Sequence, residues 1–231
     1  MSLPALFYYA SVADQKGKIS LDKETHRHVF TVLRKGVGEI IRLTDGKGFY
    51  GDAIIQSVDK KSLVVELTSI QFEEKPSKQL MLAISLLKNT ARFEWVLEKA
   101  TEIGASAIIP LICERTSREV FRADRFQQIV ASACLQSYRY HFPVLHAPQK
   151  FEELLNIPLP ELKFIAHCME GEKQKISPAQ NDSILLIGPE GDFTENEVAF
   201  AVSKKMIPVT LGDSRLRTET AGLVGLTLLR G

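Results

Sequence analysis

Two short stretches near the C-terminus combine residue types that could bind a ligand and do chemistry on it. Residues 187–193 (IGPEGDF) put two glycines and a proline in a tight turn with free backbone amides. Residues 211–221 (LGDSRLRTETA) carry two arginines, two carboxylates and several hydroxyls. Either stretch alone also fits an ordinary connection before a capped helix. Together in one half of the chain, they favour a ligand site.

The elements around these stretches form an alternating pattern of strands and helices. Apolar runs predict strands at 81–87, 106–112, 142–146, 163–167, 183–187 and 208–211. Helical spacing predicts helices at 91–103, 126–134 and 218–230, and a further helix after Thr194, where Glu197 completes a capping box. This alternation predicts an α/β domain with a parallel sheet and helices on both faces. Both stretches then lie at carboxyl ends of strands, where such sheets bind ligands.

The first part of the chain differs, because it is rich in short β-like runs. Residues 38–44, 49–58 and 62–70 predict strands, and only residues 21–35 have helical spacing. A polar break at residues 72–78, which contains Pro76, marks the expected boundary. We therefore expect a small barrel-like β-domain over residues 1–74 and the α/β domain over residues 75–231.

The residues from Gly46 to Gly51 match the G-x-G-x-x-G fingerprint of dinucleotide-binding loops. That mechanism requires a following helix whose N-terminal amides hold the pyrophosphate. A β-like run follows here instead, and Asp45-Gly46 is a hairpin signal. The match predicts a hairpin, and it argues against a dinucleotide-dependent oxidoreductase.

The composition is that of a globular protein with no excess of charge. The chain has 231 residues, a formal net charge of +1, 45% hydrophobic residues and 25% charged residues. These values exclude a disordered chain and a uniformly basic protein, although a local basic face remains compatible with an RNA partner. Three scattered cysteines predict neither a disulfide framework nor a zinc site, and we expect no metal. No secretory signal or membrane span is evident, so we expect a cytoplasmic protein.

The two C-terminal stretches also resemble the motifs of a known family. IGPEGDF followed by T-x-x-E, and then VTLGDSRLRTETAGL, resemble the paired motifs of the RsmE family. These are bacterial 16S ribosomal RNA uridine N(3)-methyltransferases of the SPOUT (α/β-knot) superfamily. HRHVFTVLRKGVGE and TDGKGFYGDAII resemble the family's N-terminal PUA-like domain, and LLKNTARFEWVLEKATEIGASAIIPLICERTSR resembles the opening of its catalytic domain. The resemblance implies a C-terminal SPOUT domain with a parallel sheet and a trefoil knot, and a small N-terminal PUA-like β-barrel.

Two positions depart from the family pattern. Asp192 stands where the family's loop commonly has a second glycine, and it either adds a carboxylate beside the methyl donor or caps the next helix. Tyr138 is bulky where a small residue is usual, between Gln136 and Arg139.

The resemblance implies that S-adenosylmethionine is the cofactor. Carried over onto this chain, the cofactor-binding residues are Gly188, Pro189, Glu190, Gly191, Leu211, Gly212, Leu216, Arg217 and Thr218. The implied reaction moves a methyl group from a sulfonium to N(3) of a uridine, which must lose its proton. An arginine can stabilise the negative charge on the uracil carbonyls, and we expect Arg217 to do so, with Arg215 as the second candidate. Glu190 and Glu219 are the candidate proton acceptors, although Glu219 also fits a helix N-terminal carboxylate.

Basic residues indicate where RNA would bind. The candidates are Arg27, Arg34 and Lys35 in the first domain, and Arg92, Arg115, Arg118, Arg122 and Arg139 in the second. The implied partner is the 16S rRNA of the small ribosomal subunit. The resemblance also implies a homodimer, and the final helix is apolar on nearly all sides, as a deeply buried or interfacial helix would be. Two alternatives remain open: a SPOUT enzyme with another RNA target, and a non-catalytic RNA-binding ribosome-assembly factor.

Overall fold

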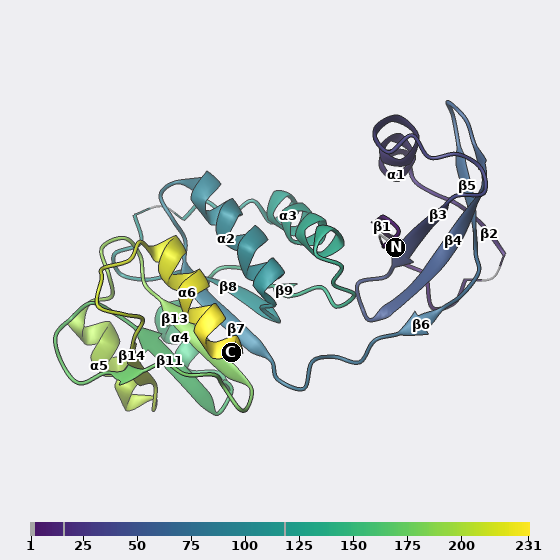
Figure 1. Ribbon diagram of the computed structural model, residues 1–231. Coiled ribbons are helices and arrows are strands. Elements are labelled where there is room, and N and C mark those ends of the chain that lie inside the picture. Colours follow the sequence, from purple (N-terminus) through teal and green to yellow (C-terminus); the bar gives the residue numbers. More distant parts are fainter. Residues whose placement is uncertain (1–2, 16, 118) are drawn as a thin grey trace. The chain divides into compact units, whose positions relative to one another are not determined.

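The computed structural model describes residues 3–15, 17–117 and 119–231, and the chain divides into two compact units. The first unit comprises the chain up to Lys75 together with Cys134–Phe142. The second comprises Pro76–Ala133 and Pro143–Gly231. Figure 1 draws both units.

The first unit is built on a six-stranded sheet with the order β1-β3-β4-β5-β2 and with β6 beside β4. Its strands are β1 (Leu6–Tyr8), β2 (Lys18–Ser20), β3 (Ile40–Thr44), β4 (Phe49–Val58), β5 (Leu63–Leu67) and β6 (Gln71–Phe72). Among the described strands of this unit, β1 and β3 pair in parallel and the other pairs are antiparallel. Residues alternate between the two sides of a strand, and one side buries Ile41, Leu43, Ile55 and Val65 in the core of this unit. A small β-rich domain is thus confirmed.

The glycine-rich stretch 46–51 joins β3 to β4 as an antiparallel hairpin, which confirms the hairpin interpretation. Asp45 holds the turn, because its Oδ1 accepts hydrogen bonds from the amides of Lys47 and Phe49. Gly46 has a φ of 71°, which glycine adopts without a steric penalty. Gly51 is needed for space, because a Cβ there would meet the Ser69 carbonyl oxygen.

The single helix expected at residues 21–35 forms as two short pieces. These are α1 (Lys23–Arg27) and a π-helical turn, η1 (His28–Val32). Asp22 caps α1 by accepting hydrogen bonds from the amides of Glu24 and Thr25. Val29 is buried against the sheet, whereas most of the polar residues face solvent.

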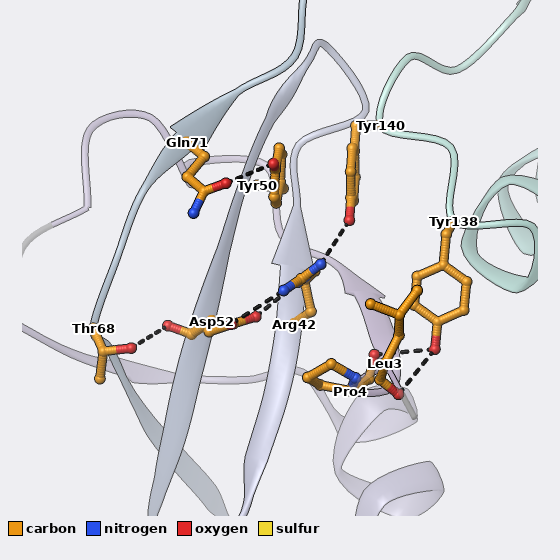
Figure 2. A network of polar contacts seen from close by, with 9 residues as sticks. All are labelled: Leu3, Pro4, Arg42, Tyr50, Asp52, Thr68, Gln71, Tyr138 and Tyr140. Carbon is orange, nitrogen blue, oxygen red and sulfur yellow. Dashed lines mark hydrogen bonds and ion pairs between the residues drawn. The ribbon is translucent and has the colours of Figure 1, made fainter. Parts of the chain in front are cut away.

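Residues Cys134–Phe142 join the first unit through a polar and aromatic network (Figure 2). Arg42 forms two hydrogen bonds with the Asp52 carboxylate, at 2.7 and 3.1 Å, and Asp52 raises the pKa of Arg42. Its Nη1 also donates to the Tyr140 hydroxyl at 2.9 Å. The rings of Tyr140 and Tyr50 stack with centroids 3.8 Å apart.

The same returning segment also contacts the start of the chain. The hydroxyl of Tyr138 donates to the carbonyls of residues 3 and 4. The division expected at residues 74/75 did not include this returning segment.

The second unit contains an eight-stranded parallel sheet with the order β10-β8-β7-β13-β11-β14-β12 and with β9 beside β8. The strands are β7 (Leu80–Ser85), β8 (Ala107–Ile112), β9 (Val144–Leu145), β10 (Gln149–Lys150), β11 (Leu162–Ala166), β12 (Gln174–Lys175), β13 (Ser183–Ile187) and β14 (Ile207–Thr210). The late strands β13 and β14 lie on either side of the earlier β11, so the chain returns into the sheet. This interleaving fits the expected SPOUT α/β fold.

Helices cover both faces of this sheet (Figure 1). They are α2 (Thr90–Ile103), α3 (Ala123–Gln136), α4 (Phe151–Leu155), α5 (Glu195–Ser203) and α6 (Thr218–Arg230). Helix α6 packs against α2, and its Gly222 and Gly225 lie close to Ile84 and Leu185. On the opposite face, Ala83, Ile184 and Leu186 form a core with α4 and α5, in which Phe193 is completely buried. The predicted parallel sheet with helices on both faces is confirmed.

We predict that Tyr140→Phe lowers the free energy of unfolding of the first unit by about 1 kcal/mol. The substitution keeps the stacked ring but leaves Arg42 Nη1 without its buried acceptor. Tyr50→Phe is the matched control, because it removes a hydroxyl that donates only to the exposed Gln71. Urea unfolding of both variants measures the difference, and equal losses would contradict a special role for the Arg42 contact.

Candidate functional site

The candidate site is a cavity of about 870 Å³ at one edge of the second unit's sheet. It lies where three neighbouring parallel strands end: β13, β11 and β14. The segments that follow these strands supply most of its wall, together with the first turns of α2 and α6. Both C-terminal motifs therefore meet at one site, as their positions after strands predicted.

The loop after β13 holds a backbone conformation that glycine normally favours. Asp192 has a φ of 63°, and its amide donates to the Pro189 carbonyl to close a tight turn. The carboxylate of Asp192 accepts hydrogen bonds from the amides of Cys168, at 2.7 Å, and Phe193, at 2.8 Å. The expectation that Asp192 caps the next helix is wrong, because Thr194 is the N-cap residue of α5. Asp192 instead ties the loop after β13 to the loop after β11.

Two further contacts fasten the loop after β13. Arg115 donates from Nη1 to the carbonyls of Gly191, at 2.9 Å, and Phe193, at 3.3 Å. The side chain of Glu190 accepts a hydrogen bond from the Lys88 amide at 3.2 Å. The loop is thus held by segments that follow β7, β8 and β11.

The expected capping box forms, and it is buried. The Thr194 hydroxyl accepts from the Glu197 amide, and the Glu197 carboxylate accepts from the Thr194 amide. The second carboxylate oxygen of Glu197 accepts from the Glu114 amide at 2.9 Å. This buried carboxylate fixes the start of α5, which follows the cavity loop in the chain.

The loop after β14 presents charged side chains to the cavity. Arg217 is the N-cap residue of α6, is exposed, and forms no ion pair with any residue that the structure describes. Glu219 follows in the first turn of α6, and its side chain is only 9% exposed. Its Oε1 lies 3.6 Å from Nη1 of Arg92, while its buried Oε2 has no hydrogen-bond partner among the residues that the structure describes.

The loop after β11 also lines the cavity, a role that was not expected from the sequence. It contributes His167, Cys168 and Lys173. Burial, together with nearby Lys173, lowers the pKa of His167 and so favours its neutral imidazole, although Asp192 acts in the opposite direction. Neither ring nitrogen has a hydrogen-bond partner among the described residues. The available signal was the position of His167 at the end of a predicted strand.

Most of the expected cofactor residues lie together. Those that line the cavity are Gly188, Pro189, Glu190, Leu211, Gly212, Leu216, Arg217 and Thr218. Gly191 is not among the lining residues, and its carbonyl accepts a hydrogen bond from Arg115. The three candidate catalytic residues Arg217, Glu219 and Glu190 all line the cavity.

The expected RNA-binding residues divide into different environments. Arg27 and Arg34 are exposed beside η1, while Lys35 is half-buried and pairs with Glu39 at 3.2 Å. Arg139 belongs to the first unit, and Arg122 is exposed. Arg92 and Arg115 instead contact Glu219 and the loop after β13. Arg118 lies outside the described residues.

Within the described ranges 3–15, 17–117 and 119–231, no cluster of three or more His, Cys, Asp or Glu side chains could hold a metal ion. In the same ranges, no helix is long and apolar enough to cross a membrane.

Comparisons with known proteins find one family that matches most of the first unit's β-rich part and another that matches nearly the whole second unit. The RNA methyltransferase domain family matches residues 73–230, and the RNA methyltransferase PUA domain family matches residues 21–68. A ribosomal RNA small subunit methyltransferase E from Bacillus subtilis is 31% identical, over 91% of this chain and 88% of that protein.

Solved structures agree along nearly the whole chain. A probable rRNA-methyltransferase from Porphyromonas gingivalis is 35% identical with a TM-score of 0.86, covering 97% of this chain and 95% of that one. A ribosomal RNA small subunit methyltransferase E from Neisseria gonorrhoeae, bound to S-adenosyl methionine, is 28% identical with a TM-score of 0.84, covering 98% and 96%. The chain therefore belongs to the family of ribosomal RNA small subunit methyltransferase E, the RsmE family that its C-terminal motifs resemble.

Proposed function

We propose that this protein transfers a methyl group from S-adenosylmethionine to N(3) of a uridine in 16S ribosomal RNA. The observation that carries the proposal is the single cavity in which the G-P-E-G loop and the R-L-R-T-E segment meet. Relatives named for small-subunit rRNA methylation, one of them solved with S-adenosyl methionine, support the choice of cofactor and substrate.

The residues of the cavity fit such a cofactor. Its walls combine backbone groups of glycine-containing loops with apolar side chains such as Ile187, Leu211 and Leu216, the mixture that nucleoside-sized ligands require. The unpartnered Oε2 of Glu219 is an unmet acceptor at the same site. When bound, S-adenosylmethionine would supply an electrophilic methyl group on a sulfonium.

The chain's own residues would supply placement, charge stabilisation and proton removal. The guanidinium of Arg217 lies at the cavity and forms no ion pair with the described part of the chain, which suits it to stabilise negative charge on the uracil carbonyls. Glu190 and Glu219 are the carboxylates on the two motif loops, and one of them could accept the N(3) proton. Glu190 is exposed, whereas Glu219 is nearly buried beside Arg92.

Incubation with labelled S-adenosylmethionine and small ribosomal subunits from cells lacking this protein tests the proposed function. We expect label in 16S rRNA, and mass analysis of its digest should place the methyl group at N(3) of one uridine. Label at another atom or in another RNA would favour the alternative SPOUT enzyme. Cofactor-independent RNA binding without label would favour an assembly factor.

In the same assay, we predict that Arg217→Ala lowers kcat by roughly 100-fold or more without changing the melting temperature. Removal of one preorganised hydrogen-bond donor that stabilises transition-state charge has an effect of this order. Arg217→Lys should recover part of the rate, because it keeps the charge but loses the planar fork. Arg125→Ala is the control, since Arg125 is exposed and pairs only with Glu94 at the surface. Near-normal turnover of Arg217→Ala would refute this role.

We further propose that residues 1–74 bind RNA and that residues 75–231 carry the catalysis. Arg27 and Arg34 are exposed on either side of η1, and the same segment exposes Phe30 and Val32. Exposed cations contact phosphates, and exposed rings can stack on bases that are not paired.

We predict that changing both Arg27 and Arg34 to Ala weakens binding to 16S rRNA roughly tenfold or more while leaving cofactor affinity unchanged. The dependence of log affinity on log salt should flatten by about 0.7–0.9 for each lost phosphate contact. Changing the exposed Lys60 and Lys61 to Ala is the control for net charge. Filter binding across a salt series measures this, and an equal loss with the control pair would contradict a specific RNA face.

We also propose that the protein acts as a cytoplasmic homodimer. Helices α2 and α6 pack together, and each leaves a large apolar side chain exposed, Trp95 at 44% and Leu228 at 38%. A second copy that covers these side chains would remove apolar surface from water.

A further inference from the structure

We infer that Arg92 and Glu219 form a charge pair that binds the α-amino-acid end of the methyl donor, with Glu219 taking its ammonium and Arg92 its carboxylate. This inference rests on the proposed function, and it assigns one end of the ligand to named side chains. Because it engages Glu219 with the ammonium, it leaves Glu190 as the candidate acceptor of the N(3) proton.

The first argument is the state of Glu219. Its side chain is 9% exposed, and its Oε2 is buried without a hydrogen-bond partner. A buried polar atom is almost always hydrogen-bonded, because an unmet bond costs free energy. Among the acidic residues that line the described cavity, Glu219 is the buried one. Glu219 is part of the cavity lining, and a ligand group with N–H donors and a positive charge would meet this demand when the carboxylate turns Oε2 toward the cavity.

The second argument is the distance between the two charges. Nη1 of Arg92 lies 3.6 Å from Oε1 of Glu219, which is beyond hydrogen-bond length. The Arg92 side chain is 42% exposed and forms no other ion pair with the residues described. Its remaining N–H groups are therefore open to an anion, and a guanidinium binds a carboxylate through two parallel hydrogen bonds.

The third argument is how charge and backbone are distributed around the cavity. The loop after β13 is rich in glycine and proline, as a wall for a flat nucleoside would be. Arg92 and Glu219 lie on the first turns of α2 and α6, away from that loop in sequence. The amino-acid end of the donor is a zwitterion with one positive and one negative charge. Glu219 and Arg92 together present the two complementary charges.

Binding of two nucleosides tests the inference. S-adenosylhomocysteine carries the amino-acid end, whereas 5′-methylthioadenosine lacks it and keeps the adenosine. We expect the unaltered protein to bind S-adenosylhomocysteine more tightly, by roughly 10- to 100-fold for each charged hydrogen bond gained. In Arg92→Ala and Glu219→Gln, this preference should shrink by about that factor, while affinity for 5′-methylthioadenosine changes less than about threefold.

Arg92→Lys should keep part of the preference, because it keeps the charge. Arg125→Ala and Glu195→Gln, which change exposed side chains outside the cavity, should keep all of it. Isothermal titration gives the affinities, and melting curves without ligand verify folding. Decarboxylated S-adenosylmethionine, tested on the unaltered protein, should lose affinity relative to S-adenosylmethionine, which probes the Arg92 contact without any substitution.

The outcomes separate the two proposals. If the unaltered protein binds neither nucleoside, the proposed function fails and this inference falls with it. If the unaltered protein prefers S-adenosylhomocysteine and the variants keep the full preference, or if the variants lose both nucleosides equally, the inference is overturned while the proposed function stands. A preference lost only for the ligand with the amino-acid end supports the assignment.

Discussion

The parallel pairing of β11 with β13 on one side and with β14 on the other is the constraint on which the candidate site depends. All three strands end at the same edge, so the segments that follow them converge although they are far apart in sequence. Because both faces of the sheet are covered, β13 is buried throughout and has no room for charged side chains. The polar side chains of the cavity therefore come from the loops at that edge and from the first turns of α2 and α6.

The two departures from the family pattern follow one physical rule. Asp192 and Tyr138 both have a positive φ, 63° and 54°, and a left-handed backbone costs a residue with a side chain roughly 1–2 kcal/mol. Each side chain forms hydrogen bonds that a glycine could not: Asp192 with two amides, and Tyr138 with two carbonyls near the N-terminus. Side-chain hydrogen bonds thus accompany a left-handed backbone at both positions. In the cavity, this anchoring joins two loops that a glycine would leave connected only by packing.

The parts of the fold that could be predicted from the sequence are those determined by local patterns. Long periodic elements such as β4, α2 and α6 match their predicted ranges closely, because apolar spacing reports which face is buried. The elements that were missed, including β1, β12 and α4, span two to five residues and carry too little pattern. Residues 134–142 return to the first unit through long-range contacts, such as the hydrogen bond of Tyr140 with Arg42 and the backbone hydrogen bonds of Tyr140 and Phe142 with the hairpin at Gly46–Gly48, which no local signal reveals.

The same distinction applies to the site. Its two motif loops are contiguous in sequence and could be identified, whereas His167 joins them only through the strand order. The arginines show the limit most clearly. Arg92 and Arg115 look like RNA contacts in the sequence, yet one faces a buried carboxylate and the other holds backbone carbonyls. The sequence shows that a residue is charged, but only the fold determines which group that residue contacts.

Glu219 connects the stability of the fold with ligand binding at the cavity. A buried oxygen without a partner costs roughly 1–3 kcal/mol, a sizeable fraction of the about 5–15 kcal/mol that keeps a domain folded. Its place in the first turn of α6 recovers some of that cost, since the helix N-terminus favours a negative charge. An apolar side chain would avoid the rest, so stability alone does not explain a glutamate here. A ligand that donates to Oε2 would remove the cost on binding, and the relief would add to its affinity.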